Sequence, residues 1–308
     1  MADIVITEFM DEEVIARDLA GRDVLYDPKL VDKPELLASS LADARALVVR
    51  NRTQVRAALL AGAPRLKVVG RLGVGLDNID VKACEQRRIA VCPATGANDV
   101  AVAEYVVTAA LMLLRTAWLA TDRVVGGEWP RMALIGREMH GQRMGLVGLG
   151  AIARETAARA RCLGMTIAAF DPHLPADHPA WSGVERLDLD ALLGSSDVIS
   201  LHVPLTPETR YMIDARALAL VKPRAVLVNA ARGGVVDEAA LIAALRAGRL
   251  GGAALDVFES EPLDASHGTA FANVPNLILT PHIAGVTEQS NVRVSSVTAA
   301  AVLRHLDA

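Results

Sequence analysis

The stretch GLVGLGAIARETAARARCLGMTIAAFDP, residues 145–172, decides the fold that this sequence predicts. It begins as a short apolar strand, turns at Gly148 and Gly150, and continues directly into a helical pattern. In a strand–turn–helix unit the first glycine permits the tight turn, and the second lets a pyrophosphate approach the helix N-terminus. Ala153 stands where a third glycine is common, and alanine is accepted there because the position serves helix–strand packing.

An acidic residue closes the same unit. Asp171 ends a predicted strand at 166–170, where a carboxylate accepts hydrogen bonds from a ribose diol. It would repel a 2′-phosphate, and no arginine follows it, so the pattern favours NAD over NADP. Taken singly, glycines at a turn often serve packing, and an aspartate before Pro172 can cap a turn. Strand, turn, helix, strand and acid in register predict dinucleotide binding.

Short apolar runs alternate with helical patterns along all 308 residues, which is long enough for two domains. Strands are predicted at 3–7, 46–49, 67–70, 89–91, 144–148, 166–170, 198–203, 225–230, 252–257 and 277–280. Helices are predicted at 53–62, 99–118, 151–163, 188–194, 214–220 and 237–247, with a further one near the C-terminus that could fold back onto the first part. Thr53 would begin the first of these helices and Gly62 would end it. The alternation predicts an α/β fold of two doubly wound parallel sheets.

Composition narrows the class of protein. The chain is 52% hydrophobic but only 3% aromatic, so the predicted core is aliphatic, as in buried parallel sheets. A net charge of −4 without a basic block argues against nucleic-acid or membrane partners. Cys84, Cys92 and Cys162 match no metal spacing and are interpreted as buried, reduced thiols, so we expect a cytoplasmic protein without a metal site.

Three later segments place polar residues just beyond predicted strands. NAARGGVVDE supplies Arg232, AALDVFESEP supplies Asp256, Glu259 and Glu261, and LTPHIAG supplies His282. Each residue alone has a plain structural explanation, as a solvated loop, surface or turn residue. Because ligands bind at the carboxyl ends of parallel strands, their recurrence there predicts one shared site.

Those segments, with VGLGAIA and HVPLTPET, resemble the D-2-hydroxyacid dehydrogenase family over nearly the whole chain. The resemblance implies NAD-dependent hydride transfer between a D-configured 2-hydroxy acid and its 2-oxo acid. It implies that Arg232, Glu261 and His282 are catalytic, with Glu259 a non-catalytic neighbour. It also implies a Rossmann NAD-binding domain at 98–285, inserted into a flavodoxin-like substrate (lid) domain formed by 1–97 and 286–308.

The resemblance also implies a cofactor site and an assembly. The cofactor residues expected are Gly148, Gly150, Ala151, Ile152, Asp171, Val203, Ala230, Asp256 and Gly285. The helix at 99–118 forms dimer contacts in the family, so a homodimer is expected. Closure of the lid domain would exclude water from the reaction.

Four arginines are candidates for a second substrate anion. Arg50, Arg52 and Arg71 each follow a predicted strand, and Arg131 corresponds to a phosphate-contacting position in some family members. The loop after Arg71, formed by Leu72, Gly73, Val74 and Gly75, could bind a carboxylate through its amides. The plain alternative is that some of these arginines are surface residues. Clustered in the substrate half, they favour a dianionic substrate.

Within the family, whole-length similarity ranks sulfolactate first among substrates, 3-phosphoglycerate second, and hydroxypyruvate or glyoxylate third. Formate is disfavoured because that branch has glutamine where Glu261 stands. Corepressors of the C-terminal binding protein type share the fold and the NAD site but only recruit partners. They carry a tryptophan in the substrate site, whereas Trp118, Trp129 and Trp181 lie outside the motifs quoted above, so an enzyme is favoured.

Overall fold

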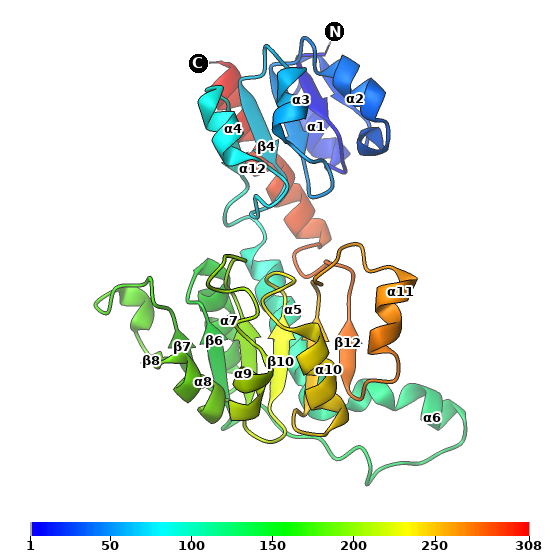
Figure 1. Cartoon of the computed structure of the whole chain (residues 1–308), viewed down its shortest axis with the longest axis vertical. Helices are drawn as coiled ribbons and strands as arrows, with labels where there is room; N and C mark the ends of the chain where they lie inside the picture. Colours follow the sequence, from blue (N-terminus) through cyan, green and yellow to red (C-terminus); the bar gives the residue numbers. More distant parts are fainter. Residues whose placement is uncertain (1, 308) are drawn as a thin grey trace. The chain divides into compact units, whose positions relative to one another are not determined.

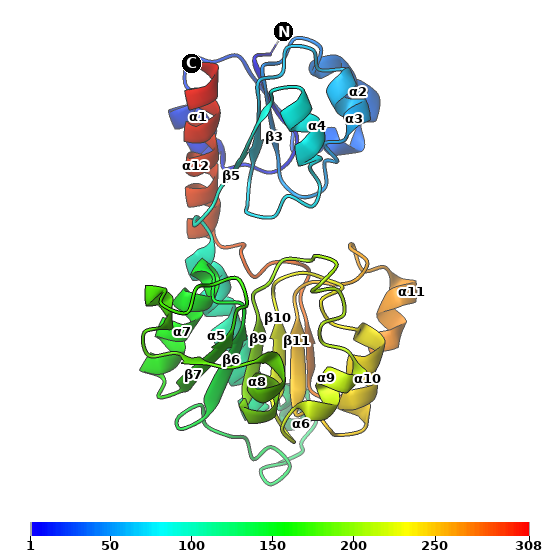
Figure 2. The same cartoon turned by 60° about the vertical axis from the view of Figure 1, so that its left-hand side comes forward.

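The computed structural model describes residues 2–307. The chain forms two compact units, Met1–Asn98 with Val286–Ala308, and Asp99–Gly285 (Figures 1 and 2). In sequence, the second unit is therefore inserted between the two parts of the first. The division expected from the sequence differs from this one only in the side on which Asn98 falls.

The first unit is built on a parallel sheet with the order β2-β1-β3-β4-β5, which is the flavodoxin-like order. Its strands are β1 (Ile4–Ile6), β2 (Val24–Tyr26), β3 (Ala46–Val49), β4 (Val68–Arg71) and β5 (Ala90–Pro93). Its helices are α1 (Glu12–Asp18), α2 (Pro34–Ser40), α3 (Ala57–Ala61), α4 (Val81–Gln86) and α12 (Glu288–Leu306). A 3-10 turn covers Leu30–Asp32.

Helices bury both faces of this sheet. Successive side chains of a strand point to opposite faces, so neighbouring residues belong to different clusters. Ile4 and Ile6 pack into a cluster with residues of α1 and α12, whereas Val5 packs into a second cluster with residues of α2, α3 and α4. Helix α12 begins at a capping box formed by Thr287 and Ser290. The prediction that the C-terminal helix folds onto the first part of the chain is confirmed.

Thr53 does not begin a helix, so that prediction is wrong. Helix α3 starts only at Ala57, and Thr53 is buried, with its hydroxyl oxygen 2.8 Å from that of Thr7. The amide of Thr53 donates to the carboxylate of Glu8 over 3.0 Å, and this buried carboxylate holds the loop out of the helix. Gly62 ends α3 as predicted.

The second unit is built on a parallel sheet with the order β12-β11-β10-β9-β6-β7-β8. Its strands are β6 (Arg143–Val147), β7 (Thr166–Phe170), β8 (Glu185–Arg186), β9 (Val198–Leu201), β10 (Val226–Asn229), β11 (Gly252–Leu255) and β12 (Leu277–Leu279). The order reverses between β6 and β9. This is the Rossmann arrangement, in which a ligand binds outside the carboxyl ends of the strands at the reversal.

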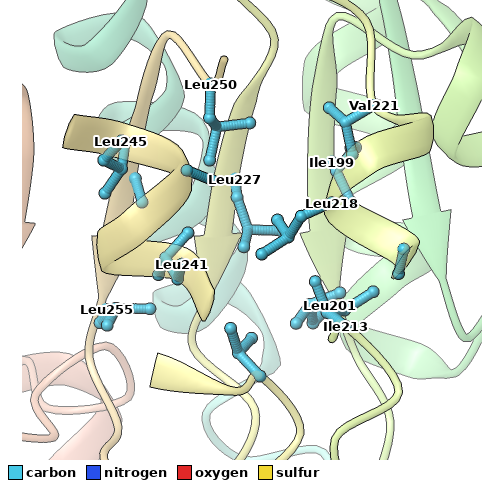
Figure 3. Packing of buried hydrophobic residues seen from close by; sticks show 14 of the residues in the cluster. Ile199, Leu201, Ile213, Leu218, Val221, Leu227, Leu241, Leu245, Leu250 and Leu255 are labelled. Carbon is cyan, nitrogen blue, oxygen red and sulfur yellow. The ribbon is translucent and has the colours of Figure 1, made fainter. Parts of the chain in front are cut away.

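Helices cover both faces of this second sheet. One face carries α5 (Asp99–Arg115) and α7 (Ala151–Cys162), and the other carries α8 (Leu189–Ser195), α9 (Ala215–Leu220) and α10 (Glu238–Arg246). Figure 3 shows the aliphatic core on the second face, where Leu227 of β10 lies among side chains of α9 and α10. The remaining elements are α6 (Thr121–Val125), α11 (Ala265–Gly268) and 3-10 turns at Ala117–Leu119, Pro179–Trp181 and Thr269–Phe271.

Aspartates set where three of these helices begin. Asp188, Asp214 and Asp237 each accept a hydrogen bond from a first-turn amide of α8, α9 and α10. The helices predicted for these segments are confirmed. Helix α5 ends at Arg115, three residues earlier than predicted, because Thr116 has a left-handed backbone with φ of 51°.

Two smaller findings bear on the composition argument. Cys84 is buried as predicted, but Cys162 is exposed at the end of α7, so the prediction of a core thiol is wrong there.

Within residues 2–307, no single helix is long and apolar enough to cross a membrane. Helix α5 and the segment Ala117–Val125 are together long and apolar enough, but they are bent by 64° relative to each other.

Candidate active site at the carboxyl ends of the larger sheet

Arg232, Glu261 and His282 lie in loops that follow adjacent strands. Arg232 follows β10, Glu261 follows β11 and His282 follows β12, and these three strands pair in parallel. Their carboxyl ends therefore meet at one edge of the sheet, as the sequence predicted. This edge also carries the turn between β6 and α7.

His282 and Glu261 form a hydrogen-bonded pair. Nδ1 of His282 lies 2.7 Å from Oε2 of Glu261, and the two side chains are 39% and 32% exposed. Burial opposes ionisation of Glu261, but hydrogen bonds from His282 and the Phe258 amide, with the charge of Arg232, hold its pKa below the ordinary value. The carboxylate is therefore ionised at neutral pH and can only accept. Nδ1 must carry the proton, which leaves Nε2 of His282 for a reactant.

The backbone at His282 is unusual, with φ of 55° in the left-handed region. Asp256 holds it on both sides. The carbonyl of Asp256 accepts the His282 amide over 2.8 Å, and its carboxylate accepts the amides of Ile283 and Ala284 over 2.8 and 2.7 Å. Asp256 is fully buried. The side-chain contacts seen for this expected cofactor residue are with Thr280 and the histidine loop.

The loop of Arg232 approaches the Glu261 loop too closely for any side chain at Gly233. A Cβ there would lie 1.7 Å from the carbonyl oxygen of Phe258. Asn229 shapes the turn from inside, since its amide group donates to the Arg232 carbonyl over 2.9 Å and its oxygen accepts the Ala231 amide over 3.1 Å. Gly233, the first glycine of NAARGG, thus lets two loops of the site come into backbone contact.

Two other histidines are less suited to proton transfer. His202 lies 2.9 Å from the hydroxyl of Ser200, and burial lowers its pKa to about 4, so it stays neutral. His267 also pairs with a carboxylate, at 2.9 Å, but its partner Asp264 caps the same short helix α11 and both side chains are about 60% exposed. Among the histidines that the structure describes, His282 alone pairs with a carboxylate across the ends of two neighbouring strands.

Glu259 has a structural role of its own. Its carboxylate accepts the Tyr211 hydroxyl over 2.8 Å and the amide of Glu238 over 3.1 Å, while its own amide donates back to Glu238 over 2.7 Å. These bonds tie the loop after β11 to the first turn of α10. Glu259 is therefore directed away from the His282–Glu261 pair.

Comparison with known proteins decides the family. Residues 107–284 match the NAD-binding domain of the D-isomer specific 2-hydroxyacid dehydrogenases. The chain is 56% identical, over 99% of both sequences, to the (S)-sulfolactate dehydrogenase of Chromohalobacter salexigens. The chain belongs to the D-isomer specific 2-hydroxyacid dehydrogenase family. It is therefore an NAD-dependent oxidoreductase.

Other members of the D-isomer specific 2-hydroxyacid dehydrogenase family show how far the likeness extends. The chain is 41% identical over 254 residues to the D-3-phosphoglycerate dehydrogenase of Archaeoglobus fulgidus, of whose length it spans only 48%. D-lactate dehydrogenase of Aquifex aeolicus, solved with NAD and lactic acid, superposes with a TM-score of 0.88 at 28% identity, over 99% of this chain and 95% of that one. The fold is thus common to members with different substrates.

The turn between β6 and α7 has the shape that the pyrophosphate of NAD requires. Gly148 has φ of 91°, and a Cβ there would lie 2.8 Å from the His202 carbonyl oxygen. Gly150 precedes α7 without a capping side chain, and apart from its chain neighbours no atom of residues 2–307 lies within 4 Å of where its Cβ would be. The N-terminus of α7 therefore has open space beside Gly150, and a helix N-terminus stabilises an anion through its dipole. Ala153 is fully buried, as its packing role predicted.

The other expected cofactor residues lie at this turn or follow other strands of the same sheet. Asp171 accepts the amides of Leu149, His173 and Leu174 over 2.9 to 3.1 Å, so it braces the turn while it remains partly accessible. Val203, Ala230 and Gly285 are half-buried beyond β9, β10 and β12. Ala151 and Ile152 form the first turn of α7. NAD fits this set of residues.

Gly150→Ala is expected to weaken NADH binding by about tenfold or more while the apoprotein keeps its melting temperature. The methyl group would contact none of the neighbouring side chains, but it would enter the space where the pyrophosphate is expected to bind. Fluorescence titration measures the affinity for NADH, and thermal melting of the apoprotein measures its stability. Gly268→Ala, also free of contacts within 4 Å, is the matched control. Unchanged NADH affinity in Gly150→Ala would place the pyrophosphate elsewhere.

Proposed function

We propose that this enzyme oxidises (S)-3-sulfolactate to 3-sulfopyruvate with NAD. The observation that carries the proposal is the 56% identity to an (S)-sulfolactate dehydrogenase over 99% of both chains. D-3-phosphoglycerate is the second candidate, because relatives with that name match at 41% identity. Both substrates carry a second anion at the third carbon, so arginines that bind it would favour both of them over an acid such as lactate.

The catalytic roles follow from the residue types. When bound, NAD would supply the acceptor for the hydride of C2 of the 2-hydroxy acid. His282 removes the hydroxyl proton at Nε2, and Glu261 stabilises the imidazolium ion that results. Arg232 binds the substrate carboxylate and, in the reverse direction, polarises the carbonyl oxygen. The 2.7 Å bond between His282 and Glu261 supports this division of roles.

We assign the NAD site and the carboxylate contact of Arg232 to the second unit, and further anion-binding groups to the first. Val74 and Gly75 have amides without a hydrogen-bond partner in residues 2–307, whereas the amides of Leu72 and Gly73 donate to Val49 and Arg71. Val74 and Gly75 are thus the pair left for a carboxylate. Arg71 folds over this loop and donates to the Leu72 carbonyl over 2.8 Å.

Arg50 is the arginine best suited to the second anion. Its guanidinium donates to the amide oxygen of Asn291 over 3.0 Å and lies 5.6 Å from the centre of the Phe9 ring. It forms no ion pair within the described chain, because the nearby Glu8 uses its carboxylate for the amides of residues 50–53. Burial lowers the pKa of Arg50, and Glu8 opposes this effect. A partly buried cation without a carboxylate partner favours an anionic ligand.

Arg52, also expected at the substrate, lies in a different environment. Its guanidinium forms an exposed ion pair with Asp32. Its charge is therefore already neutralised at the surface. Of the two arginines in the RNRT segment, only Arg50 supports a substrate role.

Arg50→Ala is expected to raise the KM for sulfolactate roughly tenfold to hundredfold, because a charge-assisted hydrogen bond contributes about 1.5–3 kcal/mol. The kcat/KM for lactate, which lacks the second anion, should change less than threefold. Arg52→Ala is the matched control and should leave both values near wild type, because an exposed ion pair contributes about 0–1 kcal/mol. Equal losses for sulfolactate and lactate in Arg50→Ala would refute the second-anion argument.

We further propose a homodimer formed by α5 and the following segment 116–136, here called the arm. The arm exposes Val125 (82%), Trp129 (77%) and Met132 (81%), which a second copy would cover. Both ends of the arm join the second unit where its strands begin, since the Arg137 amide donates to Leu114 over 2.8 Å, and Figure 1 shows α6 projecting there. A substrate role for Arg131 on the arm would therefore be exerted in a partner subunit.

Light scattering tests the dimer directly. Trp129→Glu combined with Met132→Glu should give a monomer, whereas the wild-type chain gives a dimer. A monomeric wild-type protein would end the proposal for the dimer and, with it, the role of Arg131.

A cytoplasmic location is proposed from the free thiols of Cys84, Cys92 and Cys162. The net charge of −4 supports the expectation that the partners include neither nucleic acid nor membrane.

The substrate is tested by following NADH formation with sulfolactate, 3-phosphoglycerate, glycerate and lactate. Sulfolactate should give the highest kcat/KM, and phosphoglycerate should follow. A higher value for phosphoglycerate would overturn the first choice. NADH binding without turnover of any acid would instead support a binding protein of the corepressor type.

A further inference from the structure

A chain of short hydrogen bonds leads from helix α5 to the histidine loop. The hydroxyl oxygen of Tyr105 lies 2.6 Å from that of Thr280, and Thr280 donates to Oδ1 of Asp256 over 2.6 Å. A threonine hydroxyl has one proton, which Thr280 donates to Asp256, so the phenol must donate to Thr280. The chain is therefore directed, from Tyr105 through Thr280 to Asp256.

Asp256 is where this chain meets the backbone of the histidine loop. It is fully buried, and its two carboxylate oxygens also accept the amides of Ile283 and Ala284. Its carbonyl accepts the amide of His282, whose φ of 55° is a conformation that a non-glycine residue keeps only when its surroundings enforce it. The bonds of Asp256 thus enforce the turn that presents the imidazole to Glu261.

We propose that Tyr105 and Thr280 are positioning residues for His282, which they orient through Asp256. This inference rests on the proton-transfer role of His282 proposed above. Neither residue lies in the loops of Arg232 or Glu261, and both act by fixing the hydrogen-bonding geometry of a buried carboxylate. The proposal matters for catalysis because a misplacement of about 1 Å at the reacting group can lower the rate about a hundredfold.

The plain alternative is that the hydroxyls of Tyr105 and Thr280 only satisfy each other's hydrogen-bonding needs inside the core. Tyr105 packs against the apolar cluster that α5 and α7 form on the sheet. In that case, removing a hydroxyl would lower stability but leave the turnover of the folded enzyme unchanged. The two interpretations therefore differ in which kinetic constant a substitution changes.

The test compares Tyr105→Phe, Thr280→Val and Thr280→Ser at saturating NAD, with kcat, KM and the NADH dissociation constant measured for each. Thr280→Val should lower kcat about tenfold to hundredfold, and Tyr105→Phe about threefold to tenfold. The KM for the acid and the NADH affinity should change less than threefold. Thr280→Ser keeps the donor to Asp256 and should restore most of kcat.

Tyr26→Phe is the matched control, because it removes a phenol that donates to the Met10 carbonyl over 3.1 Å in the first unit. It should leave kcat unchanged. Unchanged kcat in Thr280→Val and Tyr105→Phe with lower melting temperatures would overturn the proposal. So would a loss of NADH affinity with kcat retained, since Asp256 would then act on the cofactor.

His282→Ala, measured in the same series, distinguishes a failure of the proposed function from a failure of the positioning role. Turnover near wild type in His282→Ala would refute the proposed function itself. An inactive His282→Ala beside fully active Tyr105→Phe and Thr280→Val would refute only the positioning role. Should Thr280→Val not fold, Tyr105→Phe decides the matter, because phenylalanine keeps the packed ring.

Discussion

His282→Ala is expected to lower kcat by about 10²–10⁴-fold, the usual contribution of a general acid–base residue. Nε2 is the nitrogen left for the substrate hydroxyl once Nδ1 is held 2.7 Å from Glu261. NADH binding should remain near wild type, because His282 lies beyond β12 and away from the turn at Gly148–Gly150. Steady-state NADH formation gives kcat, and fluorescence titration gives the NADH affinity.

His267→Ala is the matched control for this substitution. His267 also pairs with a carboxylate, that of Asp264, but the pair lies on the exposed helix α11. Wild-type turnover is expected there. If His282→Ala retained turnover near the wild-type rate, or if both substitutions lowered it equally, another group would have to move the proton.

Gly233→Ala should both destabilise the second unit and abolish most activity. The new Cβ would lie 1.7 Å from the Phe258 carbonyl oxygen and 2.8 Å from the Glu259 amide nitrogen, so the loops of Arg232 and Glu261 must separate. Overpacking of this kind costs about 1–3 kcal/mol or more, which corresponds to a fall in melting temperature of several degrees. Thermal melting and kcat/KM are the measurements.

Gly62→Ala provides the control for a glycine-to-alanine change. Its Cβ would meet the Leu59 carbonyl oxygen at an ordinary 3.6 Å, at the end of α3 in the first unit. Near wild-type stability and activity are expected. A Gly233→Ala protein that melts and turns over like the wild type would show that the two loops are not in backbone contact.

Most of the second unit could be predicted from the sequence because its signals are local. The run from Gly145 to Phe170 carries strand, turn, helix and strand in order, and the structure confirms each. Strand β2, Val24–Tyr26, was missed because its apolar run is only three residues long, and β8, Glu185–Arg186, was missed because it is two charged residues.

The contacts that shape the site could not be predicted, because they join residues distant in sequence. Glu8 binds the amides of residues 50–53 and so prevents the helix start expected at Thr53. Asp32, which is twenty residues away in the sequence, likewise neutralises the charge of Arg52 in an ion pair. The steric need for Gly233 also depends on a neighbouring strand's loop. Motifs identified the residue types, and tertiary contacts decided which of them are available to a ligand.

The most direct test of the central claim is the kcat/KM for NAD-dependent oxidation of the resolved enantiomers of 3-sulfolactate, measured beside D-3-phosphoglycerate. We predict that the (S) enantiomer gives the highest value and that the (R) enantiomer is inactive. A higher kcat/KM for D-3-phosphoglycerate, or equal turnover of both enantiomers, would contradict it.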